Sequence, residues 1–529
     1  MVVRPLRATL AIVFFIGASF IATAQTPVTP PDPDQGTYTL HVDSRVVLID
    51  VTVTDSDGNP VRGLTQSDFR ISDDGHPQKL GSFEVHVESS SPVTATAAKG
   101  PNVFSNDSLL HLPSTVNVIL IDTTTIQLID QMYLYDQLTK FVEKLPAGQP
   151  VAIFHRAGQA TLLLQNFTSD HQLLLAAVRQ AVPHFVRTDA IYTTGTETLH
   201  QIAAYLAQIP GRKNVLWFSG GSNAYLFPNP VDEAPRREIY DVLEAERIAV
   251  FPIDARGLTV NGDPMPTPGD TRFFGLTGMA ESQQALMQED AEATGGHAYF
   301  NNNGLTQIAD HLVNNDGTYY TLTYYPDDVS HNGKWHNVKI ELTNSRYHLS
   351  YRRGYYDDGH NDLPPAGKSR TLLGANGSTA QEATAQHASP IIFEARILPA
   401  SAGVALTPGA ALVKPKRGET TYTVHYEVPA RDIQPKDLTS DSGKDVLGVG
   451  ILAFNQYGTP IGHDFRQFTL TIDEAKLHQH PNARLDFDQQ INLPRGEDYL
   501  DVVVCDMTSG RFGTLNLPLD VKKQASVKQ

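Results

Sequence analysis

Two kinds of hydrophobic pattern alternate along this chain. From Val47 to Thr54 apolar residues recur at every second position, which is typical of a strand with one buried face. The stretch Val118–Ile121 is instead a continuous apolar run that ends on Asp122. Such a run is typical of a central parallel strand that is buried on both faces. The pattern therefore predicts a β-rich part and a separate part with a buried parallel sheet.

Strand and helix patterns alternate from residue 112 to residue 316. After Asp122, apolar residues recur on one helical face through Leu134, Leu138 and Phe141. The later strand-like runs are Val151–Phe154, Thr161–Leu164, Asn214–Phe218 and Ala249–Asp254, with a short one at His297–Phe300. This alternation predicts a doubly wound parallel sheet with helices on both faces.

Period-two patterns flank this α/β unit, over residues 38–95 before it and 317–357 after it. We expect the two segments to form one β module, because a sheet of two or three strands is marginal in water. Tyr319–Tyr325 and Val338–Leu342 are expected to pair as a hairpin across Asn332 and Gly333. The stretch Glu88–Asp107 is rich in Ser, Thr, Ala and Pro and is interpreted as a linker.

The C-terminal part has its own pattern. Residues 358–389 are rich in Gly, Ala and Ser and predict a second linker. From residue 390 to 523, alternating strand patterns are separated by clusters of turn residues. This arrangement predicts a C-terminal β-sandwich of the immunoglobulin-like type. The fold expected for the whole chain is thus multidomain, α/β plus all-β.

The first 24 residues have the pattern of a signal peptide. Arg4 and Arg7 precede an apolar core, and Ala22-Thr23-Ala24 gives a small-x-small cleavage signal. The alternative is an N-terminal membrane anchor, but the apolar core is short for a span. We expect export with cleavage near Ala24, a Pro-rich linker over 25–37, and a mature chain without a membrane span. Its location is then the periplasm, the cell surface or the medium.

Composition narrows the range of partners. The formal net charge of −17 and the isoelectric point near 5.5 argue against nucleic acid and anionic membrane surfaces as ligands. Cys505 is the only cysteine in the sequence, so an internal disulfide is excluded. Its place in a strand pattern indicates a small buried apolar residue rather than a nucleophile.

Asp122 lies at the carboxyl end of a strand, which is where open α/β sheets normally have their ligand-binding crevice. A phosphatase of the Asp-x-Asp-x-Thr type would need a second acid at position 124, where this chain has Thr124. A serine hydrolase would need a nucleophile elbow, and the sequence around Ser222 lacks the second glycine of that motif. Phosphate-cradling and dinucleotide motifs are absent from the sequence. We therefore expect no enzyme. Asp254, in Asp-Ala-Arg-Gly, is interpreted as part of a turn with an internal ion pair.

Six motifs in order resemble one family. They are DVTVTDSDGNPVRGLTQSDFRISDDG (50–75), VILIDTTT (118–125), GRKNVLWFSGG (211–221), RIAVFPIDARGL (247–258), ATGGHAYFN (293–301), and YYTLTYYP with YRRGYY (319–326, 351–356). Together they resemble the exported VWFA-related proteins of acidobacteria, which contain a von Willebrand factor type A domain. The resemblance covers about residues 46–356 and implies a cation site at the carboxyl edge of the sheet.

The resemblance assigns metal-ligand positions to Asp122, Thr124 and Thr196. At the other two ligand positions this chain has Ile126 and Gly220. Loss of a carboxylate weakens a site for a hard cation, because ligand charge tunes affinity. We therefore expect weak or absent Mg²⁺ binding and no other cofactor.

These observations predict an exported, non-enzymatic protein that binds a protein partner or mediates adhesion in the envelope or extracellular space. The partner-binding edge is expected at Asp122, Thr123, Thr124, Thr125, Thr196, Ser219 and Gly220. Two alternatives stay open. One is a periplasmic or surface hydrolase that uses the Asp122 crevice, and the other is a purely structural module of the envelope. The oligomeric state does not follow from the sequence.

Overall fold

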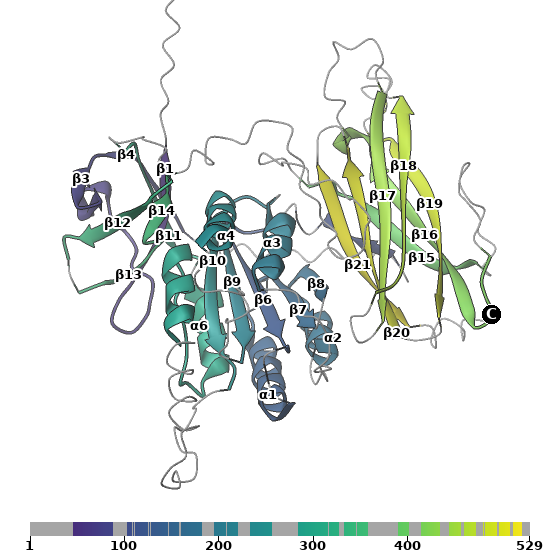
Figure 1. Cartoon of the computed structure of the whole chain (residues 1–529), viewed down its shortest axis with the longest axis horizontal. Coiled ribbons are helices and arrows are strands. Elements are labelled where there is room, and N and C mark those ends of the chain that lie inside the picture. The colour runs from purple at the N-terminus through teal and green to yellow at the C-terminus, as the bar shows by residue number, and fades with distance from the viewer. Residues whose placement is uncertain are drawn as a thin grey trace, which may run out of the picture. The chain divides into compact units, whose positions relative to one another are not determined.

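The computed structural model describes residues 46–87, 103–107, 109, 112–124, 126, 128–146, 148–157, 160–181, 195–207, 209–220, 233–256, 284–315, 317–326, 333–344, 346–357, 390–400, 414–433, 444–455, 460–471, 480, 482–494, 497–507 and 511–520 (Figure 1). The expected signal peptide, the linker at 25–37 and the linker at 358–389 lie outside these residues. Within them, no helix is both long enough and apolar enough to span a membrane.

A five-stranded sheet forms the centre of the α/β unit. Its strand order is β10-β9-β6-β7-β8. The strands are β6 (Thr115–Asp122), β7 (Val151–Ala157), β8 (Ala160–Thr168), β9 (Arg212–Ser219) and β10 (Ile248–Asp254). All eight residues of β6 are buried, and β6 is parallel to both of its neighbours. The expectation of a central parallel strand buried on both faces is confirmed.

The β8 edge differs from the expectation. β8 runs antiparallel to β7, so the predicted parallel arrangement is wrong at this strand. The two residues between Ala157 and Ala160 explain the difference. A crossover to a parallel strand needs about a dozen residues or more, whereas two residues suffice for a hairpin. The predicted strand at His297–Phe300 is reduced to one parallel bridge between Tyr299 and Ile253.

Helices cover both faces of this sheet (Figure 1). They are α1 (Leu128–Lys144), α2 (His171–Ala181), α3 (Gly195–Leu206), α4 (Glu233–Ala245) and α6 (Leu305–Asn315), with a further helix over 284–294. Ile119 and Ile121 of β6 belong to a core cluster with α1, α2 and α6. Val118 and Leu120 belong to a second cluster with α3 and α4. One apolar strand thus contributes to two cores, one on each face of the sheet.

Strands from before and after the α/β unit share two sheets. One has the order β13-β1-β11-β4 and the other the order β14-β12-β2-β3. The strands are β1 (Val47–Thr54), β2 (Phe69–Asp73), β3 (His76–Gln78), β4 (Leu80–His86), β11 (Tyr319–Tyr324), β12 (Trp335–Leu342), β13 (His348–Ser350) and β14 (Gly354–Tyr356). A short 3-10 helix, Gln66–Asp68, precedes β2. Apolar side chains of both sheets form one hydrophobic cluster.

The expected hairpin between Tyr319–Tyr325 and Val338–Leu342 is wrong. β11 pairs with β1 and β4, whereas β12 pairs with β2 and β14. β11 is buried along most of its length and lies inside its sheet, but β12 alternates between buried and exposed positions. Both partners of β11 therefore come from the N-terminal segment, whereas β12 pairs with β2 of that segment on one side and with β14 on the other.

The C-terminal residues, together with β5 (Val103–Ser105), form two antiparallel four-stranded sheets, β19-β16-β15-β5 and β18-β17-β20-β21. Their strands are β15 (Glu394–Pro399), β16 (Glu419–Pro429), β17 (Lys444–Asn455), β18 (Pro460–Thr471), β19 (Arg484–Pro494), β20 (Glu497–Asp506) and β21 (Phe512–Asp520). A 3-10 helix, Ala430–Asp432, follows β16. Side chains of both sheets share one hydrophobic cluster.

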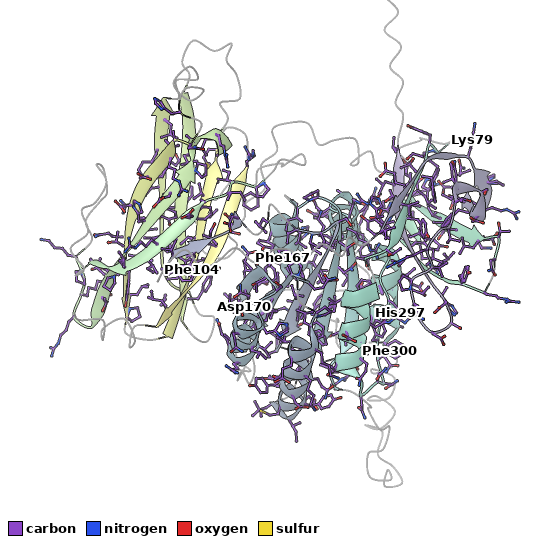
Figure 2. All side chains as sticks on the ribbon, turned by 180° about the vertical axis from the view of Figure 1, so that it is seen from behind. Lys79, Phe104, Phe167, Asp170, His297 and Phe300 are labelled. Carbon is purple, nitrogen blue, oxygen red and sulfur yellow. The ribbon has the colours of Figure 1, made fainter. Side chains whose placement is uncertain are left out.

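Strand β5 (Val103–Ser105) comes from a stretch interpreted as a linker in the sequence. It pairs antiparallel with β15, and Phe104, labelled in Figure 2, packs against the C-terminal cluster. The buried side chain of Asn106 strengthens this attachment. Its amide donates to the carbonyl of Ile391 at 2.9 Å and its Oδ1 accepts from the N–H of Phe393 at 2.8 Å. The three-residue strand is too short for its alternation to be recognised in the sequence.

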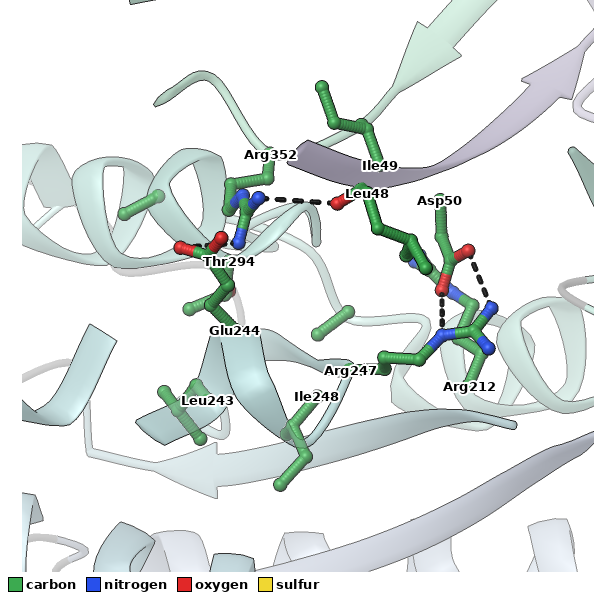
Figure 3. Close-up of a pocket in the computed structure, with 12 residues that line it drawn as sticks. Leu48, Ile49, Asp50, Arg212, Leu243, Glu244, Arg247, Ile248, Thr294 and Arg352 are labelled. Carbon is green, nitrogen blue, oxygen red and sulfur yellow. Dashed lines mark hydrogen bonds and ion pairs between the residues drawn. The ribbon is translucent and has the colours of Figure 1, made fainter. Parts of the chain in front are cut away.

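Strand β1 is held by two arginines (Figure 3). Arg247 makes a bidentate pair with Asp50, with N–O distances of 2.9 and 2.7 Å. Arg352 donates to the carbonyl of Leu48 at 3.2 Å and pairs with Glu244 of α4 at 2.6 Å. The bidentate pair combines charge with fixed geometry and connects β1 to Arg247, which directly precedes β10. Arg352 connects β1 to Glu244 of α4.

Candidate functional site at the carboxyl edge of the sheet

Asp122, the last residue of β6, is a buried and fully engaged carboxylate. Its side chain is 1% exposed. Oδ1 accepts a hydrogen bond from the backbone N–H of Thr124 at 3.1 Å and another from the Thr124 hydroxyl. Oδ2 accepts from the indole N–H of Trp217 at 3.4 Å. These contacts fix the turn that follows the strand.

Arg156 supplies the counter-charge. Its Nη1 lies 2.7 Å from Oδ2 of Asp122, and its side chain is 2% exposed. The sheet register explains the pairing, because Asp122 on β6 lies beside Arg156 on the parallel strand β7. A buried carboxylate without a partner costs several kcal/mol, and a hydrogen-bonded guanidinium offsets that cost. The Asp122–Arg156 pair is therefore a fixed part of the sheet edge.

A second strand-terminal carboxylate is neutralised in the same way. Asp254, at the end of β10, accepts from the backbone N–H and the guanidinium of Arg256 at distances of 2.7 to 3.0 Å. The hydrogen bonds that Arg256 donates to Asp254 raise the pKa of Arg256. The predicted turn with an internal ion pair is confirmed.

Burial raises the pKa of Asp130, in the first turn of α1, although the charge of Arg256 opposes that shift.

The remaining predicted edge residues have separate surroundings. The Thr123 hydroxyl lies 2.8 Å from Nε2 of His155 and donates to the carbonyl of Arg156 at 3.3 Å. Ser219 ends β9, and its buried Oγ has no hydrogen-bond partner among the described residues. Thr196 is buried in the first turn of α3, and Gly220 is buried after β9. Thr125 lies outside the described residues.

The geometry at Asp122 does not fit a resident Mg²⁺. A hard cation binds through oxygen lone pairs, with carboxylates as its charged ligands. Both Asp122 oxygens already accept hydrogen bonds, and one of them faces a guanidinium charge. Thr196 is not among the described partners of Asp122. Ile126 is 5% exposed and packs into a core cluster, so its position supplies no ligand.

Exposed apolar side chains lie beside this edge. α1 begins after the turn that follows β6, and its first residues include Leu128 at 39%, Ile129 at 77% and Met132 at 52% exposure. The same helix buries Leu134, Leu138 and Phe141 on its inner face, as its periodicity predicts. The start of α1 is thus apolar on its outer side as well, and exposed apolar groups beside a sheet edge are typical of interaction surfaces.

A separate cluster in the β module could hold a metal ion. A ring nitrogen of His336, a carboxylate oxygen of Asp73 and a carboxylate oxygen of Asp74 lie within 4.8 Å of one another. The cluster is not predictable from the sequence, because Asp73-Asp74-Gly75 is a hairpin-turn sequence and His336 is more than 250 positions away. Neither residue type nor spacing gives a signal at that separation.

No family model matches the chain, and no curated protein matches it. Among solved structures, it is similar to a von Willebrand factor type A protein from Catenulispora acidiphila, with 9% identity, 88% of this chain and 78% of that chain covered, and a TM-score of 0.27. It is also similar to the ArnB paralog VWA2 from Sulfolobus acidocaldarius, with 10% identity, coverage of 56% and 78%, and a TM-score of 0.24.

A third similar structure is proximal thread matrix protein 1 from the mussel byssus, described with a zinc-occupied MIDAS motif. The identity is 11%, the coverage is 40% of this chain and 47% of that chain, and the TM-score is 0.26. This chain therefore spans about half the length of that protein. At these identities and scores, the matches carry no argument about ligands or partners.

Proposed function

We propose that this chain is an exported, non-enzymatic interaction protein whose α/β unit is of the von Willebrand type A kind and recognises a protein partner without a metal ion. The observation that carries the proposal is the neutralised edge. Asp122 and Asp254 each pair with an arginine, and exposed apolar residues of α1 lie beside them. Such an edge favours a partner that presents apolar side chains over one that completes a cation site with a carboxylate.

The hydrolase alternative needs a free base or nucleophile at the same edge. A general base must have a lone pair within hydrogen-bond reach of substrate. Both oxygens of Asp122 are engaged, and the Asp254 side chain is 0% exposed. These observations favour the interaction role over catalysis at Asp122. The third alternative, a structural envelope module, differs from the proposal in requiring no separable partner.

The remaining architecture is proposed as follows. Residues 1–24 form a signal peptide, 38–95 and 317–357 form one β module, and 112–316 form the type A-like domain. Residues 390–523 form an immunoglobulin-like sandwich, to which β5 adds a strand. The pairing of β1 with β11 supports the β module, and the two sheets with one shared core support the sandwich. The basic start and apolar core of the first 24 residues support export.

Substitution of the exposed apolar residues tests the proposal. Partners would be crosslinked to the tag-free chain in its native envelope fraction or medium, with and without EDTA. Ile129→Ser and Met132→Ser should each lower the yield of a specific crosslinked partner at least about fivefold, because hot-spot residues dominate binding. EDTA should leave the yield unchanged.

Leu173→Ser is the matched control. Leu173 is 47% exposed at the start of α2, which follows the antiparallel strand β8 and therefore begins at the opposite edge of the sheet. This control should retain the partner. A partner lost with EDTA, or retained by both α1 variants, would contradict the proposal. Turnover of an ester or phosphate substrate that Asp122→Asn abolishes would favour the hydrolase.

A further inference from the structure

The turn between β2 and β3 meets strand β12 in the β module. Asp73 ends β2, and the positive φ values of Asp74 (47°) and Gly75 (81°) form a tight turn. Asp74 and Asn337 exchange two hydrogen bonds, from Asp74 N–H to the Asn337 carbonyl at 2.9 Å and from Asn337 N–H to Asp74 Oδ1 at 2.8 Å. Since Asp73 pairs with Val338 in the β2–β12 register, His336 lies opposite the turn.

Three potential ligand atoms converge here. Nδ1 of His336 lies 3.2 Å from Oδ2 of Asp74 and 3.6 Å from Oδ1 of Asp73. Ligand bonds of about 2.0–2.2 Å in a tetrahedral site place neighbouring ligand atoms about 3.3–3.6 Å apart. The two histidine–carboxylate separations lie within about 0.1 Å of this range, and all three ligand atoms lie within 4.8 Å of one another.

Asp73 has an unsatisfied oxygen at this point. Its side chain is 5% exposed, and Oδ1 has no hydrogen-bond partner among the described residues. The other oxygen, Oδ2, accepts from the hydroxyls of Tyr324 and Tyr355, both at 2.8 Å. An orphaned oxygen on a buried carboxylate is costly, and Oδ1 lies on the side of His336.

Among the described residues, no lysine or arginine neutralises the two aspartates of this cluster. Among the described contacts, neither Asp73 nor Asp74 makes an ion pair with a lysine or an arginine. This differs from Asp122 and Asp254, which are each paired with an arginine. Two carboxylates around one imidazole leave net negative charge in a mostly buried site, and a divalent cation would neutralise it.

We propose that Asp73, Asp74 and His336 form a binding site for a divalent transition-metal ion, with Zn²⁺ as the ion that fits best. Imidazole nitrogen favours Zn²⁺ over Mg²⁺ and Ca²⁺, which take oxygen ligands. Nδ1 of His336 and one oxygen of each aspartate are the ligands. The Asp74 side chain is 44% exposed, so a water molecule completes the tetrahedron from the solvent side.

Neighbouring groups orient the histidine ligand. Nε2 of His336 faces Oδ2 of the buried Asp357 at 3.9 Å. The imidazole ring stacks on Tyr355, with ring centroids 5.1 Å apart and planes 7° apart. A carboxylate facing the second imidazole nitrogen is the common arrangement around metal-bound histidine. At 3.9 Å this contact is longer than a hydrogen bond, and Nε2 has no hydrogen-bond partner among the described residues, so the stacked ring of Tyr355 is the group that orients the imidazole. The ion would link the N-terminal β segment to the segment that follows the α/β unit.

Zinc titration of the tag-free full-length chain tests this site. Isothermal calorimetry with Zn²⁺ should give one saturable site, and addition of Zn²⁺ should raise the melting temperature. Asp74→Asn should weaken binding by at least about 10-fold. Loss of an outer partner of a metal ligand already lowers affinity by about 10–100-fold, and loss of the ligand itself should lower it at least as much. Because Asp74 is partly exposed, this variant is expected to fold. Its fold would be checked by circular dichroism.

A matched control and a spectroscopic readout complete the test. Asp57→Asn changes an exposed acid in another turn of the same module and should leave binding unchanged. Co²⁺ should give visible d–d absorption typical of tetrahedral coordination by nitrogen and oxygen, and His336→Asn should abolish it. If His336→Asn does not fold, Asp74→Asn decides alone. Absence of saturable Zn²⁺ binding, or binding unaffected by Asp74→Asn, would overturn the proposal.

Discussion

The guanidinium of Arg156 lies 2.7 Å from the carboxylate of Asp122, and both side chains are almost wholly buried. The pair stands at the carboxyl edge of the sheet, where the family resemblance implies a cation. A guanidinium supplies fixed positive charge and directional hydrogen bonds but offers no exchangeable coordination position. Because both side chains are buried, dissolved salt screens this pair much less than an exposed one, and the charge of Asp122 is neutralised within the sheet.

Breaking this pair should destabilise the α/β unit. Arg156→Met leaves Asp122 buried without a counter-charge and should lower the free energy of unfolding by about 3–5 kcal/mol. The double variant Asp122→Asn/Arg156→Met should lose less than the sum of the two single variants, because neither charge is left alone. Urea unfolding followed by Trp217 fluorescence in a Trp335→Phe background reports on this unit, since Trp217 is buried in its core.

Lys140→Met is the control for that cycle. Lys140 pairs with Asp136 on α1, and both side chains are about half exposed. A surface pair of this kind contributes about 0–1 kcal/mol, so this variant should unfold at nearly the same urea concentration as the parent. Equal losses from Arg156→Met and Lys140→Met would show that the buried pair has no special importance.

Lys213 should make the stability of the α/β unit rise with pH in mildly alkaline solution. Burial lowers the pKa of Lys213 to about 8, below the value of about 10.4 in an unfolded chain. Between these values the unfolded chain holds a proton that the folded chain has released, so the free energy of unfolding increases with pH. The slope is at most about 1.4 kcal/mol per pH unit for one group.

Comparison with Lys213→Met isolates this effect. The ammonium of Lys213 donates to the carbonyl of Glu246 at 2.8 Å, and methionine keeps the length of the side chain without the titrating group. The difference in unfolding free energy between parent and variant should change steadily from pH 8 to about 9.5, below the range in which tyrosines of an unfolded chain ionise. A difference that is constant with pH would contradict the assignment.

The Cys505 thiol should be unreactive in the folded chain. Burial raises the pKa of Cys505 to about 12, and the thiolate is the reactive form. At pH 8 the thiolate fraction should then be about a thousandfold smaller than for an ordinary thiol with a pKa of about 8.5. Labelling with a chromogenic disulfide should be correspondingly slow in buffer and rapid in denaturant. Rapid labelling of the folded chain would show an accessible, activated thiol instead.

Local patterns predict the strands and helices better than their partners. The apolar run up to Asp122 predicts a buried central strand, and the periodicity of Leu134, Leu138 and Phe141 predicts the inner face of α1. Both follow from the side-chain geometry of a single element. The partners of β11 depend on which strands lie side by side, and hydrophobic periodicity does not contain that information. The direction of β8 follows instead from the short connection after β7, because a connection of a few residues suits a hairpin and not a parallel crossover; the expectation of a parallel strand failed because it took no account of that length.

In the candidate site, too, the position of a residue on its own strand is predictable, but its partner on another strand is not. Asp122 could be placed at the sheet edge from sequence, because a strand-terminal acid follows an apolar run. Its partner could not be identified, since Arg156 follows the apolar residues of β7 as an ordinary charged residue and meets Asp122 only through the sheet register. Asp73 and His336 meet through the pairing of β2 with β12. Contacts between distant strands follow from the fold, not from local spacing.

Calorimetric titration with Mg²⁺ is the most direct test of the central claim that the Asp122 edge works without a metal ion. The titration should use the Asp74→Asn variant, so that the cluster in the β module does not contribute, and the double variant Asp74→Asn/Asp122→Ala as its reference. Neither protein should give saturable heat up to millimolar Mg²⁺. A micromolar site that is present in the first variant and absent from the second would contradict that claim.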